Sequence, residues 1–121
     1  MTLATGIDLL EIARLQTAIE RHGESFLRRI YTPAERDLCA GNFASLAVRF
    51  AAKEAVTKAL GTGIGAVSWH EIEILRNEKG APTLQLYGKA LELSQSLGFH
   101  SWSISLSHTR EHAIAMAIAL A

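Results

Sequence analysis

The spacing of apolar residues changes about halfway along the chain. Up to Leu60 most of them recur every three or four residues, as on one face of an α-helix. Beyond Gly65 they mostly alternate with polar residues, as in a half-buried β-strand. Helices gathered in one half and strands in the other predict an α+β fold rather than a parallel α/β sheet. We therefore expect a compact molecule whose helical first half packs on a mainly antiparallel sheet.

The first half opens with a short predicted strand, residues 3–8, that ends at a polar residue. A helix is expected next, interrupted at Gly23, with an apolar stripe made of Ile12, Leu15, Ile19 and Phe26. Residues 32–35 read Thr-Pro-Ala-Glu, which predicts a helix start with a capping box. A third helix is expected over residues 45–60, with a left-handed cap at Gly61.

The second half alternates more strictly. Ile72 and Ile74 alternate with Glu71 and Glu73, which predicts a half-buried strand whose glutamates face solvent. Residues 77–82 have the composition of a turn, and Leu84 and Leu86 alternate in a predicted returning strand. We expect a short helix over residues 88–97 and a strand over residues 102–107 after it. The alanines of the last segment, residues 113–121, fit either a helix or a strand, and their strict alternation with larger residues favours a strand.

Size and charge limit what the chain does. Its 121 residues predict a single domain spanning residues 1–121. Twelve Lys and Arg balance twelve Asp and Glu, which argues against a nucleic-acid partner. The single Cys39 excludes an internal disulfide. With no signal-peptide pattern and no apolar run long enough to span a bilayer, we expect a cytoplasmic protein without membrane contact.

The third predicted helix carries the strongest chemical signal. Glu54 and Lys58 are four residues apart and share one helical face. A surface salt bridge worth ~0.3–0.5 kcal/mol is one interpretation of this pair. The other is a phosphate site, because Arg49 and Lys53 lie on the same helix and the glycine-rich loop with Gly61, Gly63 and Gly65 follows it. No Gly-Lys-Ser/Thr ends this loop, so it is not a P-loop.

Asp8 is the second candidate. A carboxylate after a strand is often a helix N-cap. Alternatively, Asp8 pairs with Glu54, and two hard carboxylate oxygens completed by water and phosphate suit Mg²⁺. Zinc is disfavoured because the sequence shows no cysteine or closely spaced histidine ligands.

Two further sets of polar residues are candidates. Ser107 and His108 end a predicted strand, either as an exposed polar edge or as donors to a phosphate. A serine hydrolase is disfavoured, because Gly-x-Ser-x-Gly is absent. Arg14, Arg21 and Arg28 recur every seven residues, which fits a solvated helix face or a surface that holds an acidic helical partner.

These segments together resemble the holo-[acyl-carrier-protein] synthase family of phosphopantetheinyl transferases. The motifs follow in order through nearly the whole chain: residues 6–8 (Gly-Ile-Asp) with 11–14 (Glu-Ile-Ala-Arg), 31–35 (Tyr-Thr-Pro-Ala-Glu), 49–63 (from Arg-Phe-Ala-Ala-Lys-Glu to Gly-Thr-Gly), 80–82 (Gly-Ala-Pro) and 105–108 (Ser-Leu-Ser-His). Two positions depart from the family pattern: Ala4 stands where the family often has glycine in its opening strand, and Tyr31 stands where another apolar residue is common.

The resemblance implies the compact phosphopantetheinyl transferase fold and a Mg²⁺-dependent reaction. The 4′-phosphopantetheine of coenzyme A moves to a serine of an apo acyl carrier protein, 3′,5′-ADP leaves, and fatty acid biosynthesis is served. The implied roles are metal binding by Asp8 and Glu54, phosphate stabilisation by Lys58, coenzyme A contacts by Arg49, Lys53, the loop glycines, Pro82, Ser107 and His108, and carrier docking by Arg14, Arg21 and Arg28. The resemblance also implies a homotrimer with active sites at its interfaces.

Two alternatives stay open at this point. One is the same chemistry on a polyketide or peptide-synthase carrier. The other is a noncatalytic protein that binds coenzyme A or a carrier, although such a protein needs no combination of metal ligands and lysine.

Overall fold

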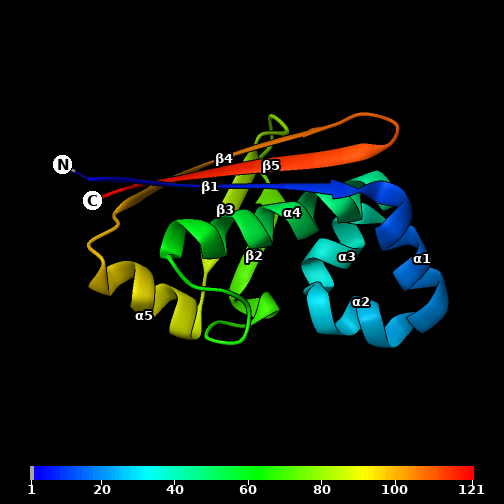
Figure 1. Ribbon diagram of the computed structural model, residues 1–121, viewed down its shortest axis with the longest axis horizontal. Helices are drawn as coiled ribbons and strands as arrows, with labels where there is room; N and C mark the ends of the chain where they lie inside the picture. Colours follow the sequence, from blue (N-terminus) through cyan, green and yellow to red (C-terminus); the bar gives the residue numbers. More distant parts are fainter. Residues whose placement is uncertain (1) are drawn as a thin grey trace.

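The computed structural model describes residues 2–121. A strand comes first, followed by four helices, a hairpin preceded by one 3₁₀ turn, a fifth helix and two strands (Figure 1). In chain order the elements are β1 (Leu3–Glu11), α1 (Ile12–His22), α2 (Glu24–Ile30), α3 (Pro33–Cys39), α4 (Phe43–Leu60), η1 (Trp69–Glu71), β2 (Ile72–Arg76), β3 (Pro82–Leu86), α5 (Gly88–Ser96), β4 (Ser101–His108) and β5 (His112–Leu120).

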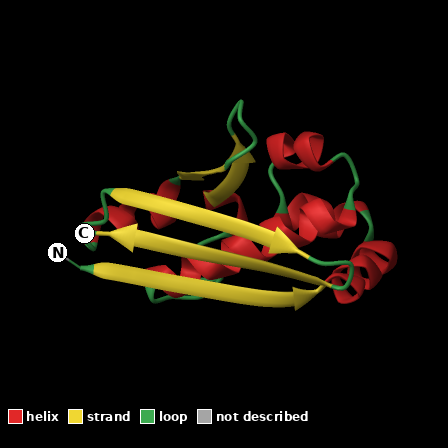
Figure 2. Ribbon diagram, turned by 90° about the horizontal axis from the view of Figure 1, so that it is seen from above, coloured by secondary structure: helices red, strands yellow, loops and turns green. Residues whose placement is uncertain are grey.

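The main sheet is antiparallel, with strand order β1-β5-β4, so the first and last strands pair and Thr2 lies beside Ala121 (Figures 1 and 2). The α+β class and the strand at the C-terminus are confirmed. The predicted end of the first strand is wrong: pairing with β5 continues to Glu11 opposite His112. Asp8 therefore lies within a strand, and α1 begins four residues later, so Asp8 is not its N-cap.

Helix α4 lies against the inner face of this sheet and is buried on nearly every side. Asn42 caps its N-terminus, where the Oδ1 atom accepts a hydrogen bond from the amide of Ser45, and Gly61 ends it in the predicted left-handed conformation (φ 76°). The β5 residues that face α4 are all alanines, each at most 1% exposed: Ala113, Ala115, Ala117 and Ala119. These small side chains let the helix approach the sheet closely.

The closest approach is between β1 and α4 at Gly6. A Cβ atom on Gly6 would lie 1.8 Å from the carbonyl oxygen of Ala55. Only glycine fits there, because the obstacle is backbone of the helix. This contact brings the inward-facing side of β1, including Asp8, against the helix that carries Glu54 and Lys58.

The helices α1 to α3 cover one end of α4, and the β2–β3 hairpin covers another side of it. Gly23 (φ 56°) separates α1 from α2, as predicted. The predicted capping box is present: the Thr32 hydroxyl accepts from the amide of Glu35, and the Glu35 carboxylate accepts from the amide of Thr32. Both parts of the hydrophobic core contact Leu10 and Leu106, which join them.

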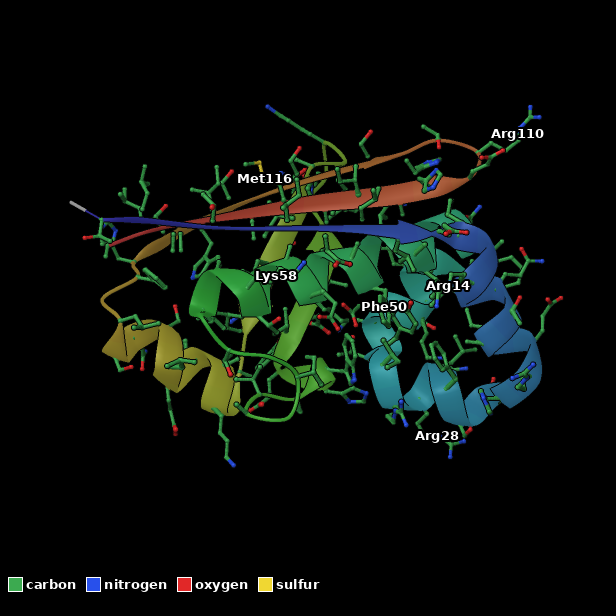
Figure 3. The ribbon with its side chains drawn as sticks, in the orientation of Figure 1. Arg14, Arg28, Phe50, Lys58, Arg110 and Met116 are labelled. Atoms are coloured by element: carbon green, nitrogen blue, oxygen red, sulfur yellow. The ribbon has the colours of Figure 1, made fainter. Side chains whose placement is uncertain are left out.

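The outer face of the main sheet carries apolar side chains in the open. Leu3, Ile7, Leu9 and Met116 are 64%, 53%, 63% and 40% exposed. Figure 2 looks onto this face and shows no helix in front of the three strands, and Figure 3 shows Met116 standing away from the helices. Within residues 2–121, no helix is long and apolar enough to cross a membrane.

Candidate active site

Asp8 and Glu54 line the same cavity, although 46 positions separate them in the chain. Asp8 points inward from β1, and Glu54 lies on the side of α4 that faces the same strand. The cavity has a volume of about 360 Å³ and is lined by Asp8, Leu9, Leu10, Glu11, Arg14, Phe50, Glu54 and His112. Figure 3 shows Phe50 and Lys58 on α4 and Arg14 on the neighbouring α1.

The two carboxylates influence each other. Partial burial raises the pKa of Glu54, and the negative charge of Asp8 raises it further, whereas the ammonium of Lys58 lowers it. The ionised form of Glu54 is therefore disfavoured unless a cation lies close by.

Lys58 supplies one such positive charge. Its ammonium donates hydrogen bonds to the carbonyl oxygen of Ile7 at 2.8 Å and to Oδ1 of Asp8 at 3.3 Å. The Lys58 side chain is 53% exposed and that of Asp8 19%. Lys58 thus pairs across to β1 rather than along its own helix with Glu54, and the interpretation of Glu54 and Lys58 as a simple intrahelical salt bridge is wrong.

The oxygens of Asp8 and Glu54 fit Mg²⁺. This ion usually takes one or two carboxylates, retains several waters and accepts substrate phosphates as its other ligands. Across residues 2–121 no group of three or more His, Cys, Asp and Glu side chains is placed to hold a metal. Two carboxylates at an open cavity therefore match a magnesium site that a substrate completes, and they do not match a closed zinc site.

The structure places Lys53 in the core. Its ammonium lies 2.8 Å from Oε1 of Glu35, both side chains are 0% exposed, and it donates to the carbonyl oxygens of Trp69 and Ile72 at 2.8 and 2.6 Å. Three oxygens use all three of its donors. Lys53 has no donor left for a phosphate of coenzyme A, and we correct its predicted role to a structural one.

Arg49 is also buried, with 6% exposure. Its Nε donates to the carbonyl oxygen of Ile74 at 3.1 Å, and its Nη1 donates to the carbonyl and hydroxyl oxygens of Ser45 at 3.2 and 2.8 Å. These bonds fasten β2 to α4. Because these bonds involve only Nε and Nη1, they do not exclude a phosphate contact through Nη2, and the predicted phosphate contact of Arg49 stays a prediction.

Two buried glutamates complete this polar core; Glu35 was predicted only as part of the capping box, and the burial of Glu73 was not predicted. Oε2 of Glu35 accepts from the amide of Ile74 at 2.7 Å. Glu73, expected to face solvent, is 9% exposed and accepts from the hydroxyls of Thr32 at 2.6 Å and Tyr87 at 3.0 Å. Both carboxylates favour the charged form of Lys53 and so raise its pKa against the effect of burial.

The glycine-rich loop leaves α4 one turn beyond Lys58. Gly61 caps the helix, and Gly63 and Gly65 are exposed, the latter with a φ of 123°. The loop thus lies at the end of the helix that carries the catalytic candidates.

The remaining coenzyme A candidates lie elsewhere. Ser107 and His108 end β4, and His108 lines a separate cavity with Phe43 and Arg110. Pro82 begins β3 and lines a third cavity beside Trp102 of β4. Strands β1 and β4 are the two outer strands of the main sheet, about 10 Å apart across β5. His108 and Pro82 therefore line other cavities than the one that Asp8 and Glu54 line.

The three arginines do not form one row. Arg14 lines the cavity of Asp8 and Glu54, and Arg21 is exposed further along α1. Arg28 lines a different cavity between α2 and α3, whereas Arg29 faces the groove between α1 and α2. Figure 3 shows Arg14 and Arg28 at different sides of the helical part. The turn at Gly23 interrupts the sevenfold spacing, so Arg28 does not share a face with Arg14.

Phe50 and His112 also line the cavity and were not predicted as site residues. Phe50 belongs to the same sequence motif as Glu54, which was a usable signal. His112 reaches the cavity only because β5 pairs it with Glu11 at the end of β1, and no local pattern indicates that.

Comparisons with known proteins agree with this architecture. The model of the 4′-phosphopantetheinyl transferase superfamily matches residues 4–117. A holo-[acyl-carrier-protein] synthase from Dehalococcoides mccartyi is 52% identical over 97% of this chain and 98% of its own length. One from Koribacter versatilis is 47% identical over 98% of both chains.

A solved structure is similar over nearly the whole chain. The Helicobacter pylori holo-[acyl-carrier-protein] synthase, crystallised in complex with coenzyme A, has a TM-score of 0.88 and 37% identity, and the match covers 96% of this chain and 99% of that one. From the family model, the identities and the shared fold, we conclude that this chain belongs to the 4′-phosphopantetheinyl transferase superfamily, within its holo-[acyl-carrier-protein] synthase family.

Proposed function

We propose that this protein transfers the 4′-phosphopantetheine arm of coenzyme A to a serine of an apo acyl carrier protein. The observation that carries the proposal is that Asp8 and Glu54 line one cavity and Lys58 contacts Asp8, in a chain of this family. In the reaction, the serine oxygen bonds to the phosphorus that bears the pantetheine, the bond from that phosphorus to the bridging oxygen breaks, and 3′,5′-ADP leaves.

Asp8 and Glu54 would hold Mg²⁺, which when bound neutralises charge on the pyrophosphate as it shifts to the leaving group. The ammonium of Lys58, next to Asp8, would stabilise the phosphate that is transferred. Two acceptors fit the serine proton, namely the Glu54 carboxylate and a water beside it.

Coenzyme A would also contact Ser107, His108, Pro82 and the loop glycines. His108 lies at the β4 edge of the main sheet and Pro82 lies beside β4, whereas Asp8 lies on the other edge strand, β1. We therefore propose that a second copy of the chain supplies His108 and Pro82. The uncovered apolar face of the main sheet supports a homotrimer in which the three sheets face one another. Each active site would then lie between the β1 side of one protomer and the β4 side of its neighbour.

The carrier protein would dock on α1. Arg14 is exposed at the rim of the cavity, and Arg21 follows two turns later on the same helix. Guanidinium groups there would steer an acidic helix of the carrier toward the reacting centre. A role in fatty acid biosynthesis and a cytoplasmic location stay predictions.

The test is mass spectrometry of apo acyl carrier protein incubated with this protein, coenzyme A and Mg²⁺, with EDTA and Asp8→Asn as controls. We expect a mass gain of one phosphopantetheine on the carrier and release of 3′,5′-ADP, both lost in the controls. Folded protein that binds coenzyme A but modifies no carrier would contradict the proposal and favour a noncatalytic binder. Faster modification of polyketide or peptide-synthase carriers would change the substrate but not the chemistry.

A further inference from the structure

The ammonium of Lys58 lies in the gap between α4 and β1, where it contacts Oδ1 of Asp8 and the carbonyl oxygen of Ile7. Figure 3 shows Lys58 reaching from α4 toward β1. Its charge also lowers the pKa of Glu54. The ammonium is therefore the direct counter-ion of Asp8, and its charge also acts on the nearby Glu54.

A divalent cation would compete for the same place. Mg²⁺ binds carboxylate oxygens at about 2.0–2.1 Å. A cation that close to Asp8 would lie within a few ångströms of the ammonium, which is 3.3 Å from the same carboxylate. The two positive charges repel, and they share one acceptor. The Lys58 side chain is 53% exposed and unbranched, so it is free to swing away.

We propose that Lys58 is the internal counter-ion of the metal-free site and that an incoming divalent cation displaces its ammonium from Asp8. This inference rests on the metal site in the proposed function. It assigns Lys58 a second role, because the lysine that stabilises the phosphate also sets the metal affinity. Loading of the cation frees the ammonium for the substrate, so the lysine is delivered to the phosphate only when the metal is in place.

The test is titration of the intact, substrate-free protein with Mn²⁺, followed by electron paramagnetic resonance of the free ion. Lys58→Met removes the competing charge at a half-exposed position and leaves the carboxylates in place. We expect this variant to bind Mn²⁺ about 2- to 10-fold more tightly than the wild type, the range expected for losing one partly exposed ion pair and its repulsion of the metal. Lys79→Met, in the exposed turn of the β2–β3 hairpin, makes the same charge change away from the cavity and should leave the affinity unchanged.

Lys58→Arg keeps the positive charge and should bind Mn²⁺ no more tightly than the wild type. Equal or weaker binding by Lys58→Met, with circular dichroism showing a native fold, would overturn the inference, as would equal tightening by Lys79→Met. If the proposed metal site at Asp8 and Glu54 does not exist, the result is different: the wild type would bind no Mn²⁺, or Asp8→Asn would bind Mn²⁺ as tightly as the wild type does.

Discussion

Replacement of Lys53 by methionine tests whether the structure assigns this residue correctly. Methionine fills a similar volume but leaves Glu35 as a buried carboxylate without a cation, and it leaves the carbonyl oxygens of Trp69 and Ile72 without their donor. Burial lowers the pKa of Lys53, and Glu35 opposes this shift, so the charged form of the lysine depends on its partner.

Breaking a buried ion pair by removing one partner costs about 3–5 kcal/mol. That is a large part of the roughly 5–15 kcal/mol by which a domain is stable. For a chain of this size the melting temperature should fall by about 10–20 °C. The double variant Lys53→Met/Glu35→Gln should recover part of the loss, because no unpaired charge remains.

The assay is thermal unfolding by circular dichroism at one fixed protomer concentration, with Lys79→Met as an exposed control. Coenzyme A affinity is measured by calorimetry well below the melting temperature, where the variant is folded. We expect a lower melting temperature and a nearly unchanged affinity. A normal melting temperature together with lost coenzyme A binding would refute this reasoning and return Lys53 to the substrate site.

Three other predictions follow from the site and the sheet. The folded-state pKa of Glu54 lies above its ordinary value, so ionisation of this carboxyl opposes folding. In metal-free protein, Glu54→Gln should therefore have a larger free energy of unfolding than the wild type at pH 7, and this difference should vanish as the pH falls to about 4. Chemical denaturation across that pH range measures it, and a gap independent of pH would contradict the assignment. Met116→Arg puts a charge on the uncovered face of the main sheet and should turn trimers into monomers by sedimentation velocity, whereas an unchanged mass would place the interface elsewhere. Arg14→Glu should raise the KM for the carrier far more than the KM for coenzyme A, whereas Arg28→Glu, at a different cavity, should change neither KM. Equal effects of the two variants would contradict docking of the carrier beside the cavity of Asp8 and Glu54.

Local sequence signals predicted most elements, because caps and alternation act over a few residues. The capping box at Thr32 and Glu35, the left-handed cap at Gly61 and the two C-terminal strands needed no tertiary information. The boundary of β1 did need it, since pairing with β5 extends the strand past Asp8 to Glu11.

The roles of charged residues were harder to predict than the elements. Lys53 and Glu54 are consecutive on α4, yet one is sealed in the core and the other lines the cavity. A solvated face cannot be inferred from the pattern of a helix that is buried on nearly every side. The contact between Lys58 and Asp8 joins residues 50 positions apart and depends on Gly6, whose lack of a side chain lets β1 touch α4.

In the proposed trimer, each active site is shared between the β1 side of one protomer and the β4 side of another. Asp8→Asn disables the first side, and His108→Glu puts a negative charge where the second is proposed to hold a phosphate. Each variant alone should be inactive in the carrier-modification assay. After subunit exchange in an equal mixture, random closed trimers should recover about a quarter of the wild-type rate, because one intact site forms in each mixed trimer. No recovery, with mixed trimers demonstrated by native mass spectrometry, would contradict a shared site.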